Sequence, residues 1–158
     1  MKLKVLAFGR LKFPGYRAAA DEYLKRLQPW VSAQEIELKP TSVPDKSDST
    51  RLRIQTVEGK LLLEKTKAAH LVLLDETGRS LKTQEWAQRV RDWESSGSDV
   101  VVAVGSSLGW SPEVRAQAHE VLSLGPQTLP HELARVVLLE QLYRAFSVVR
   151  GHPYHNEG

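Results

Sequence analysis

The chain has 158 residues, of which 41% are hydrophobic and 26% are charged, and this is enough for one domain with a full-sized core. It has no cysteine, which excludes disulfides, zinc–thiolate sites and thiol nucleophiles. No stretch of about 18 apolar residues could cross a membrane. The first residues fit a strand and loop better than a secretory signal. Because the lack of cysteine fits a cytosolic protein, we expect a cytoplasmic location.

The net charge of +3 is unevenly distributed, because residues 1–30 contain seven Lys and Arg and only two acidic residues. A basic segment can bind a polyanion such as a nucleic acid. The alternative is a solvated helix face. Asp21 and Lys25 have the four-residue spacing of a helical ion pair. Glu22 and Arg26 have the same spacing, so both interpretations stay open at this point.

Strand and helix patterns alternate along the chain. We expect strands at residues 2–9, 34–39, 70–76, 98–107 and 120–125, and helices at about 16–27, 49–69, 83–93, 111–118 and 130–151. This alternation indicates a single α/β domain over residues 1–158, with a mostly parallel sheet flanked by helices.

Polar residues mark where several of these helices should begin. Asp48 or Ser49 can cap the second helix, and Thr83 can cap the third. Ser111 followed by Pro112 is typical of the first positions of a helix, and it predicts the start of the fourth.

Apolar residues fall on nearly every side of the last predicted helix, which ends at Gly151. A helix packed on one sheet needs a single apolar stripe, so we expect a second copy of the chain to cover the other side. Glu140 and Arg144 share a face and predict an internal ion pair that holds a dimer face, because buried charges must be paired. The alternative is that Arg135 or Arg144 points into a functional site.

The sequence VGSSLGWSP follows the fourth predicted strand and carries Gly105 and Gly109. Ligands bind at the ends of such strands in open α/β sheets, although the same glycines would suit a plain turn. The chain has neither a P-loop motif nor a G-x-S-x-G elbow. His152 and His155 form H-x-x-H without a nearby carboxylate or cysteine, so we expect no metal site.

The stretch TLPHELARVVLLEQLYRAFSVVRGHPYH resembles the C-terminus of the RlmH family of small SPOUT-class ribosomal RNA methyltransferases. The similarity runs along the whole chain and includes KLKVLAFGRLK, DEYLKRL, VLLDETGRSL and VGSSLG. It implies a SPOUT fold with a C-terminal trefoil knot and a homodimer. It also implies S-adenosyl-L-methionine as the methyl donor and N3 of a pseudouridine in 23S rRNA as the target, on the large subunit or the assembled ribosome.

By matching position, the resemblance assigns the methyl-donor contacts to two strand ends and to the loop after the fifth strand. They are Leu74, Gly105, Leu124, Gly125, Pro126, Gln127, Thr128 and Leu129. The chain departs from the family at Ser106, where Gly is common, and at Gly125-Pro126, where Ser without a following Pro is common. A side chain at position 106 would narrow the loop if that residue needed a positive φ.

Methyl transfer to N3 requires alignment of the two reacting atoms and a route for the N3 proton. His131 and His155 are the candidates for accepting that proton. Tyr154 can stack on the target base or bind its carbonyls, and Arg144 can neutralise charge on the ring. We expect the tail to pack over the methyl donor across the dimer.

Two other functions fit the same residues. One is a SPOUT methyltransferase that acts on a different RNA site. The other is a non-catalytic ribosome-binding protein with this fold, for which Ser106 and the Gly125-Pro126 loop are the supporting features.

Overall fold

The structure is a computed structural model that describes residues 1–156. Five parallel strands form the centre of this part of the chain. The last two residues of the expected domain, 157–158, lie outside the described residues. The strands are β1 (Lys2–Phe8), β2 (Ser32–Leu38), β3 (His70–Ser80), β4 (Val100–Val104) and β5 (Glu120–Ser123). The helices are α1 (Pro14–Leu27), α2 (Asp48–Lys65), α3 (Thr83–Ser96), α4 (Pro112–Gln117) and α5 (His131–Val149).

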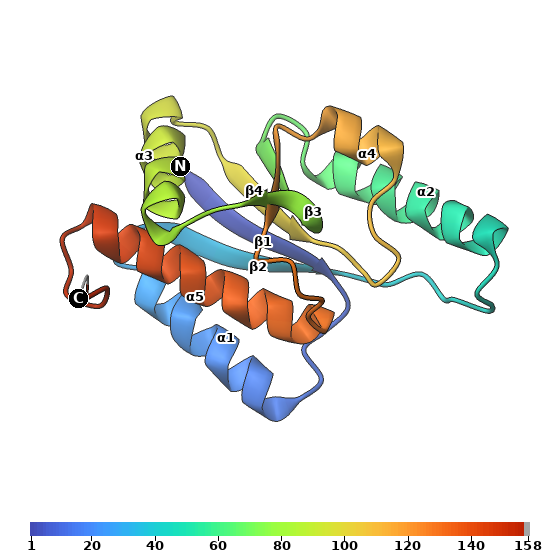
Figure 1. Cartoon of the computed structure of the whole chain (residues 1–158), viewed down its shortest axis with the longest axis horizontal. Coiled ribbons are helices and arrows are strands. Elements are labelled where there is room, and N and C mark those ends of the chain that lie inside the picture. The colour runs from blue at the N-terminus through green and yellow to red at the C-terminus, as the bar shows by residue number, and fades with distance from the viewer. Residues whose placement is uncertain (157–158) are drawn as a thin grey trace.

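The strands pair in the order β2-β1-β4-β3-β5, and helices cover both faces of the sheet (Figure 1). α1, α3 and α5 bury one apolar cluster against one face, while α2 and α4 bury a second cluster against the other. The central strand β4 reads VVVAV and is buried at every position, as expected for a strand covered on both faces. The predicted α/β class is confirmed, and the knot stays a prediction of the resemblance.

The start and end of α2 differ from the prediction. Ser47 caps the helix, because its hydroxyl accepts a hydrogen bond from the Thr50 N–H at 3.3 Å, so neither Asp48 nor Ser49 is the cap. The helix also stops before residue 69. Ala68 has a φ of 66°, which a right-handed helix cannot contain.

α3 also begins differently from the prediction, whereas α4 begins as predicted. Thr83 lies inside the first turn of α3, and the Glu85 carboxylate instead accepts a hydrogen bond from the Lys82 N–H at 2.7 Å. At α4, Ser111 is the cap and accepts from the Val114 N–H at 3.3 Å. The prediction for α3 was wrong because the Glu85 carboxylate in the first turn, rather than a Thr83 hydroxyl, accepts the hydrogen bond at the start of the helix.

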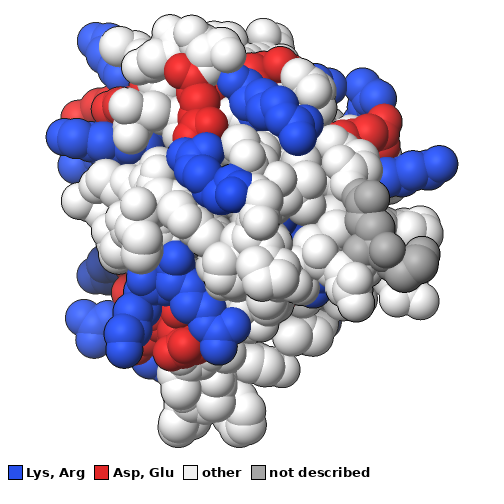
Figure 2. Space-filling model, turned by 90° about the vertical axis from the view of Figure 1, so that its left-hand side faces the viewer, with Lys and Arg blue, Asp and Glu red and all other residues white. Residues whose placement is uncertain are grey.

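Several charges of α1 are engaged in ion pairs. Glu22 and Arg26 pair at 2.8 Å as predicted. Asp21 pairs with Arg17 at 2.7 Å rather than with Lys25, because two nitrogens of the Arg17 fork reach one Asp21 oxygen. On the face shown in Figure 2, Lys and Arg side chains lie beside Asp and Glu, with broad uncharged areas between them. Of the two interpretations of the basic segment, the solvated helix face therefore explains these paired charges of α1.

α5 lies between α1 and α3 on its face of the sheet (Figure 1). These two helices cover much of the apolar surface that we had assigned to a second copy of the chain. A half-exposed line of side chains remains at helical spacing, and we call it the α5 stripe: Leu133, Val137, Gln141, Arg144 and Val148. The predicted Glu140–Arg144 ion pair is confirmed at 2.5 Å beside this stripe.

Arg135 joins α5 to the sheet from inside the protein. Its side chain is 3% exposed, and its guanidinium contacts Glu35 at 2.5 Å and Glu37 at 2.7 Å on β2. The Arg135 charge is therefore neutralised within the fold by two carboxylates of β2, an arrangement that the sequence did not predict.

We expect Arg135→Ala to lower the free energy of unfolding by about 2 kcal/mol, because the buried Glu35 carboxylate loses its charged hydrogen bonds to Arg135 and keeps only Arg17 as a cationic partner. Chemical denaturation measures this change. Arg26→Ala is the matched control, since it breaks an exposed pair and should cost less than about 1 kcal/mol. Equal losses for the two variants would contradict the structural importance of the Arg135 pair.

Candidate functional site

A cavity of about 910 Å³ lies at the carboxyl ends of the strands. Its walls come from the segments that follow β1, β2, β4 and β5, together with residues 74–76 of β3, α2 and the first turn of α5. In open α/β sheets this edge is where ligands bind, because the loops that leave neighbouring strands diverge there. The position of the cavity therefore makes it the candidate ligand site.

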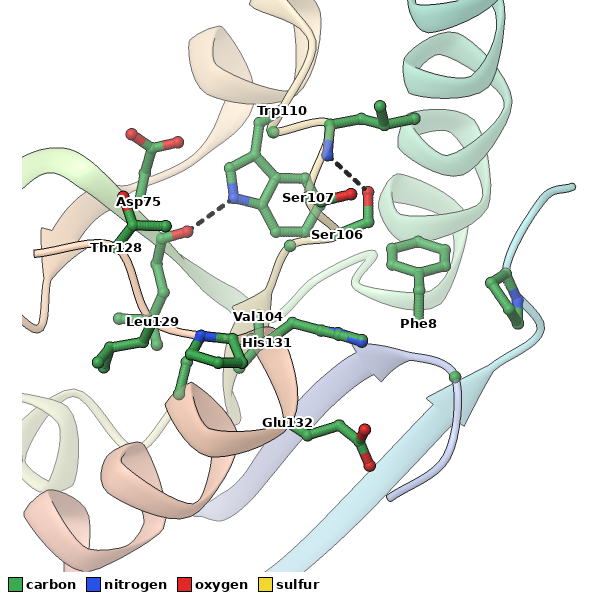
Figure 3. A pocket seen from close by; sticks show the side chains of 18 of the residues that line it. Phe8, Asp75, Val104, Ser106, Ser107, Trp110, Thr128, Leu129, His131 and Glu132 are labelled. Atoms are coloured by element: carbon green, nitrogen blue, oxygen red, sulfur yellow. Dashed lines mark hydrogen bonds between the residues drawn. The ribbon is translucent and has the colours of Figure 1, made fainter. Parts of the chain in front are cut away.

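The residues that the resemblance assigned to the methyl donor gather around this cavity. Those that line it are Leu74, Gly105, Leu124, Gly125, Gln127, Thr128 and Leu129, and Pro126 does not line it. Figure 3 shows Thr128 and Leu129 on one side of the cavity, with Ser106 and Phe8 on the other. The structure thus brings seven of the eight predicted donor contacts to one place.

Trp110 links two of the strand ends that form the cavity, and sequence analysis did not single it out. Its indole N–H donates a hydrogen bond to the Leu74 carbonyl at 2.9 Å (Figure 3). A Cβ added to Gly105 would lie 3.0 Å from the Trp110 ring, so the ring occupies the space beside that glycine. The signal for Trp110 was present in the sequence, since a large aromatic residue follows the glycines of VGSSLGWSP.

Two carboxylates fix the loops on the Thr128 side of the cavity. Asp75 pairs with Arg115 at 2.6 Å and accepts two hydrogen bonds from Thr77. Burial raises the pKa of Asp75, but the Thr77 and Arg115 contacts outweigh it, and the pKa lies below its ordinary value. Glu76 accepts a hydrogen bond from the Thr128 hydroxyl at 2.9 Å, which holds the loop after β5 against β3.

The backbone accommodates both departures from the family pattern. Ser106 does not have a positive φ, so its side chain does not strain the loop. Gly125 has a φ of 137°, a conformation that glycine adopts without a steric penalty. The two features offered for a non-catalytic protein therefore fit the loop geometry, and they do not favour that alternative.

Glu58 of α2 is a second residue that sequence analysis missed. It is 6% exposed, lines the cavity, and accepts hydrogen bonds from the Ser106 hydroxyl at 3.2 Å and the Thr41 N–H at 3.3 Å. Burial raises the pKa of Glu58, and these two hydrogen bonds only partly offset the shift. No motif marks this residue, because α2 is far from the other site residues in sequence.

The four predicted catalytic residues fall into two groups. His131 is the first residue of α5 and lines the cavity (Figure 3). Arg144, Tyr154 and His155 form a separate cluster near the other end of α5, which we call the tail cluster. Arg144 lies thirteen positions after His131 in the helix, or about 20 Å along the axis at 1.5 Å per residue.

The tail cluster is held together by polar and aromatic contacts. The Arg144 guanidinium lies 3.1 Å from Nδ1 of His155 and 4.8 Å from the centre of the Tyr154 ring. The Tyr154 hydroxyl donates to Glu140 at 3.0 Å. Burial, followed by hydrogen bonds with Tyr23 and Glu140, raises the pKa of Tyr154 well above its ordinary value, so its hydroxyl stays protonated.

Within residues 1–156, no group of three or more His, Cys, Asp and Glu side chains is arranged to hold a metal ion. His152 instead packs its ring edge-on against Trp30, with the ring centres 5.3 Å apart. In the same part of the chain, none of the helices has the length and apolar character needed to span a bilayer.

Residues 1–155 match the protein family described as "Predicted SPOUT methyltransferase", and the chain belongs to this family. It is therefore a methyltransferase of the SPOUT class, as the sequence resemblance predicted. More specifically, it is 39% identical to "Ribosomal RNA large subunit methyltransferase H" of Acidovorax ebreus (strain TPSY), over 99% of this chain and 100% of that protein. A protein of the same name from Hahella chejuensis (strain KCTC 2396) is 40% identical, over 99% of this chain and its own full length.

Among solved structures, the chain is similar to "a probable methylase family protein from Haemophilus influenzae Rd KW20", with a TM-score of 0.60. That likeness covers 98% of this chain and 70% of the other, at 16% sequence identity. It supports the assignment of the fold.

Proposed function

We propose that this protein transfers a methyl group from S-adenosyl-L-methionine to N3 of a pseudouridine in 23S rRNA. The observation that carries the proposal is the full-length similarity to proteins named for large-subunit ribosomal RNA methylation. The cavity supports it, because its position suits a nucleoside-containing donor. The proposed location is the cytoplasm, where ribosomes are available.

In this proposal the methyl donor occupies the cavity. The loop 124–129, Leu74 and Gly105 bind its adenosine part, largely through main-chain groups. Bound S-adenosyl-L-methionine supplies an electrophilic methyl carbon, so the protein needs no covalent intermediate. The work of the chain is to align the target N3 with that carbon and to receive or pass on the N3 proton.

The proposed active site combines two copies of the chain. The tail cluster is too far along α5 from the cavity of its own chain to meet a donor there. A second copy packed on the α5 stripe could bring its Arg144, Tyr154 and His155 to the first copy's cavity. Tyr154 would then stack on the target base, Arg144 would stabilise negative charge on the ring, and His131 or His155 would accept the proton.

We expect strong methyl transfer to assembled ribosomes or large subunits and weak transfer to naked 23S rRNA. The reason is that a net charge of +3 offers few phosphate contacts, so the correctly shaped surface must come from the ribosome. Transfer of labelled methyl groups to each substrate tests this, and mass mapping of rRNA from a deletion strain identifies the nucleotide. Equal rates on both substrates would contradict the ribosome preference, and a modified nucleotide elsewhere would indicate a different RNA site.

A further inference from the structure

Glu58 is a buried carboxylate that lacks a cationic partner. It is 6% exposed, and among the described residues it takes part in no ion pair. Other acidic residues near the sheet edge do have partners: Asp75 pairs with Arg115, and Glu35 pairs with Arg135. Glu58 is therefore different in kind from the carboxylates that stabilise the fold.

The two protein groups that contact Glu58 are neutral. The Ser106 hydroxyl and the Thr41 N–H approach at 3.2 and 3.3 Å, which is long for hydrogen bonds to a carboxylate. A buried charge without a counter-charge is costly, and proteins rarely keep one that has no function. Because Glu58 lines the cavity, a ligand in that cavity can supply the missing positive charge.

We propose that Glu58 binds the α-ammonium group of the methyl donor and so selects for the amino-acid end of that molecule. This inference rests on the proposed function, in which the adenosine part lies at the loop 124–129. Ser106 lies on the opposite side of the cavity from Thr128 and Leu129 (Figure 3), and its hydroxyl contacts Glu58. A donor that spans the cavity from the loop therefore reaches Glu58 with its other end.

The ammonium group fits this environment better than the sulfonium group. An ammonium has three N–H donors, and the two carboxylate oxygens and the Ser106 hydroxyl can all accept hydrogen bonds. A sulfonium has no N–H and gains only a charge contact. The carboxylate of the donor, next to its ammonium, can turn to Arg10 or Lys12, which are basic residues of the cavity wall.

Glu58→Gln tests the inference, since the amide has the same shape and still reaches Thr41 and Ser106. Calorimetry would compare three ligands: S-adenosyl-L-methionine, S-adenosylhomocysteine, which keeps the ammonium but lacks the sulfonium, and methylthioadenosine, which lacks both. We expect the first two to bind about 10- to 100-fold more weakly, as for loss of a charged hydrogen bond, and the third to bind unchanged. We also expect the variant to melt at a higher temperature than the wild type, because the buried charge is gone.

Glu64→Gln is the matched control, because it removes one charge from an exposed position of the same helix. It should bind all three ligands as the wild type does. Weaker binding of all three ligands to Glu58→Gln would show that Glu58 has a structural role. Weaker binding of S-adenosyl-L-methionine alone would show that Glu58 contacts the sulfonium rather than the ammonium. Either result, or no change, would overturn the inference, whereas a wild type that binds none of the ligands would instead refute the proposed function.

Discussion

Truncation after Gly151 is expected to reduce methyl transfer to ribosomes by at least about 100-fold while leaving the protein folded and able to bind the methyl donor. Tyr154 and His155 are lost in this variant, and a group that handles a proton contributes about 10²- to 10⁴-fold to a rate. The buried strands and α5 are all retained. The residues that line the cavity all precede Gly151 and are retained, so donor affinity should largely survive in both copies of the dimer.

The tail also packs against the rest of the protein, so single substitutions within it must be compared with the truncation. The Tyr154 ring lies 4.5 Å from that of Tyr143, and its loss will lower the melting temperature somewhat. Tyr154→Phe keeps the ring and removes only the hydroxyl that donates to Glu140. His155→Ala removes the contact with Arg144 and leaves the aromatic packing in place. We expect Tyr154→Ala and His155→Ala each to lower the rate, and Tyr154→Phe to lower it less than Tyr154→Ala.

Mixing two impaired variants, at a donor concentration too low to fill the Gly105→Val cavity, tests whether the tail acts across the dimer. One partner would be the truncated chain, and the other would carry Gly105→Val, which damages the cavity but keeps the tail. After free exchange, half of the dimers hold one copy of each, and one of their two sites is intact, which gives about a quarter of the wild-type activity. Wild type and variants should all sediment at about twice 17.8 kDa. A clean monomer, or near-normal turnover by the truncated chain, would refute the composite site.

Much of the fold follows from patterns that do not depend on tertiary contacts. The apolar run of β4 and the Ser111-Pro112 start of α4 were visible in the sequence because local chemistry determines both. α5 was harder. Its apolar sides suggested a partner chain, but the sequence could not tell that α1 and α3 flank it, because helix neighbours are set by the topology of the sheet.

Some residues of the candidate site could likewise be predicted from the sequence, and others could not. The glycines and the tail residues were recognisable from their positions and from the family resemblance. Trp110 and Glu58 were not, because their importance comes from contacts with residues 36 and 48 positions away, Leu74 and Ser106. A hydrogen bond between distant segments leaves no periodic or local signal in one sequence.

Gly105→Val is expected to weaken binding of S-adenosyl-L-methionine by about 10- to 100-fold. The Cβ alone would lie 3.0 Å from the Trp110 ring, and the two methyl groups of valine need still more room. Overpacking of this kind costs about 1–3 kcal/mol. If the ring moves away, its hydrogen bond to the Leu74 carbonyl is lost, and two predicted donor contacts shift together.

A smaller side chain at position 110 provides the decisive control. Gly105→Ala should weaken donor binding less than Gly105→Val, since only one methyl group must be accommodated. Trp110→Phe removes the indole N–H and frees space beside position 105. If the clash is the cause, the double variant Gly105→Ala/Trp110→Phe should lose less donor binding free energy than the sum of the losses in the two single variants. The reason is that the two residues are in contact, so their effects couple. Additive losses would mean that Gly105 acts without Trp110, and unchanged affinity in Gly105→Val would mean that the donor binds elsewhere.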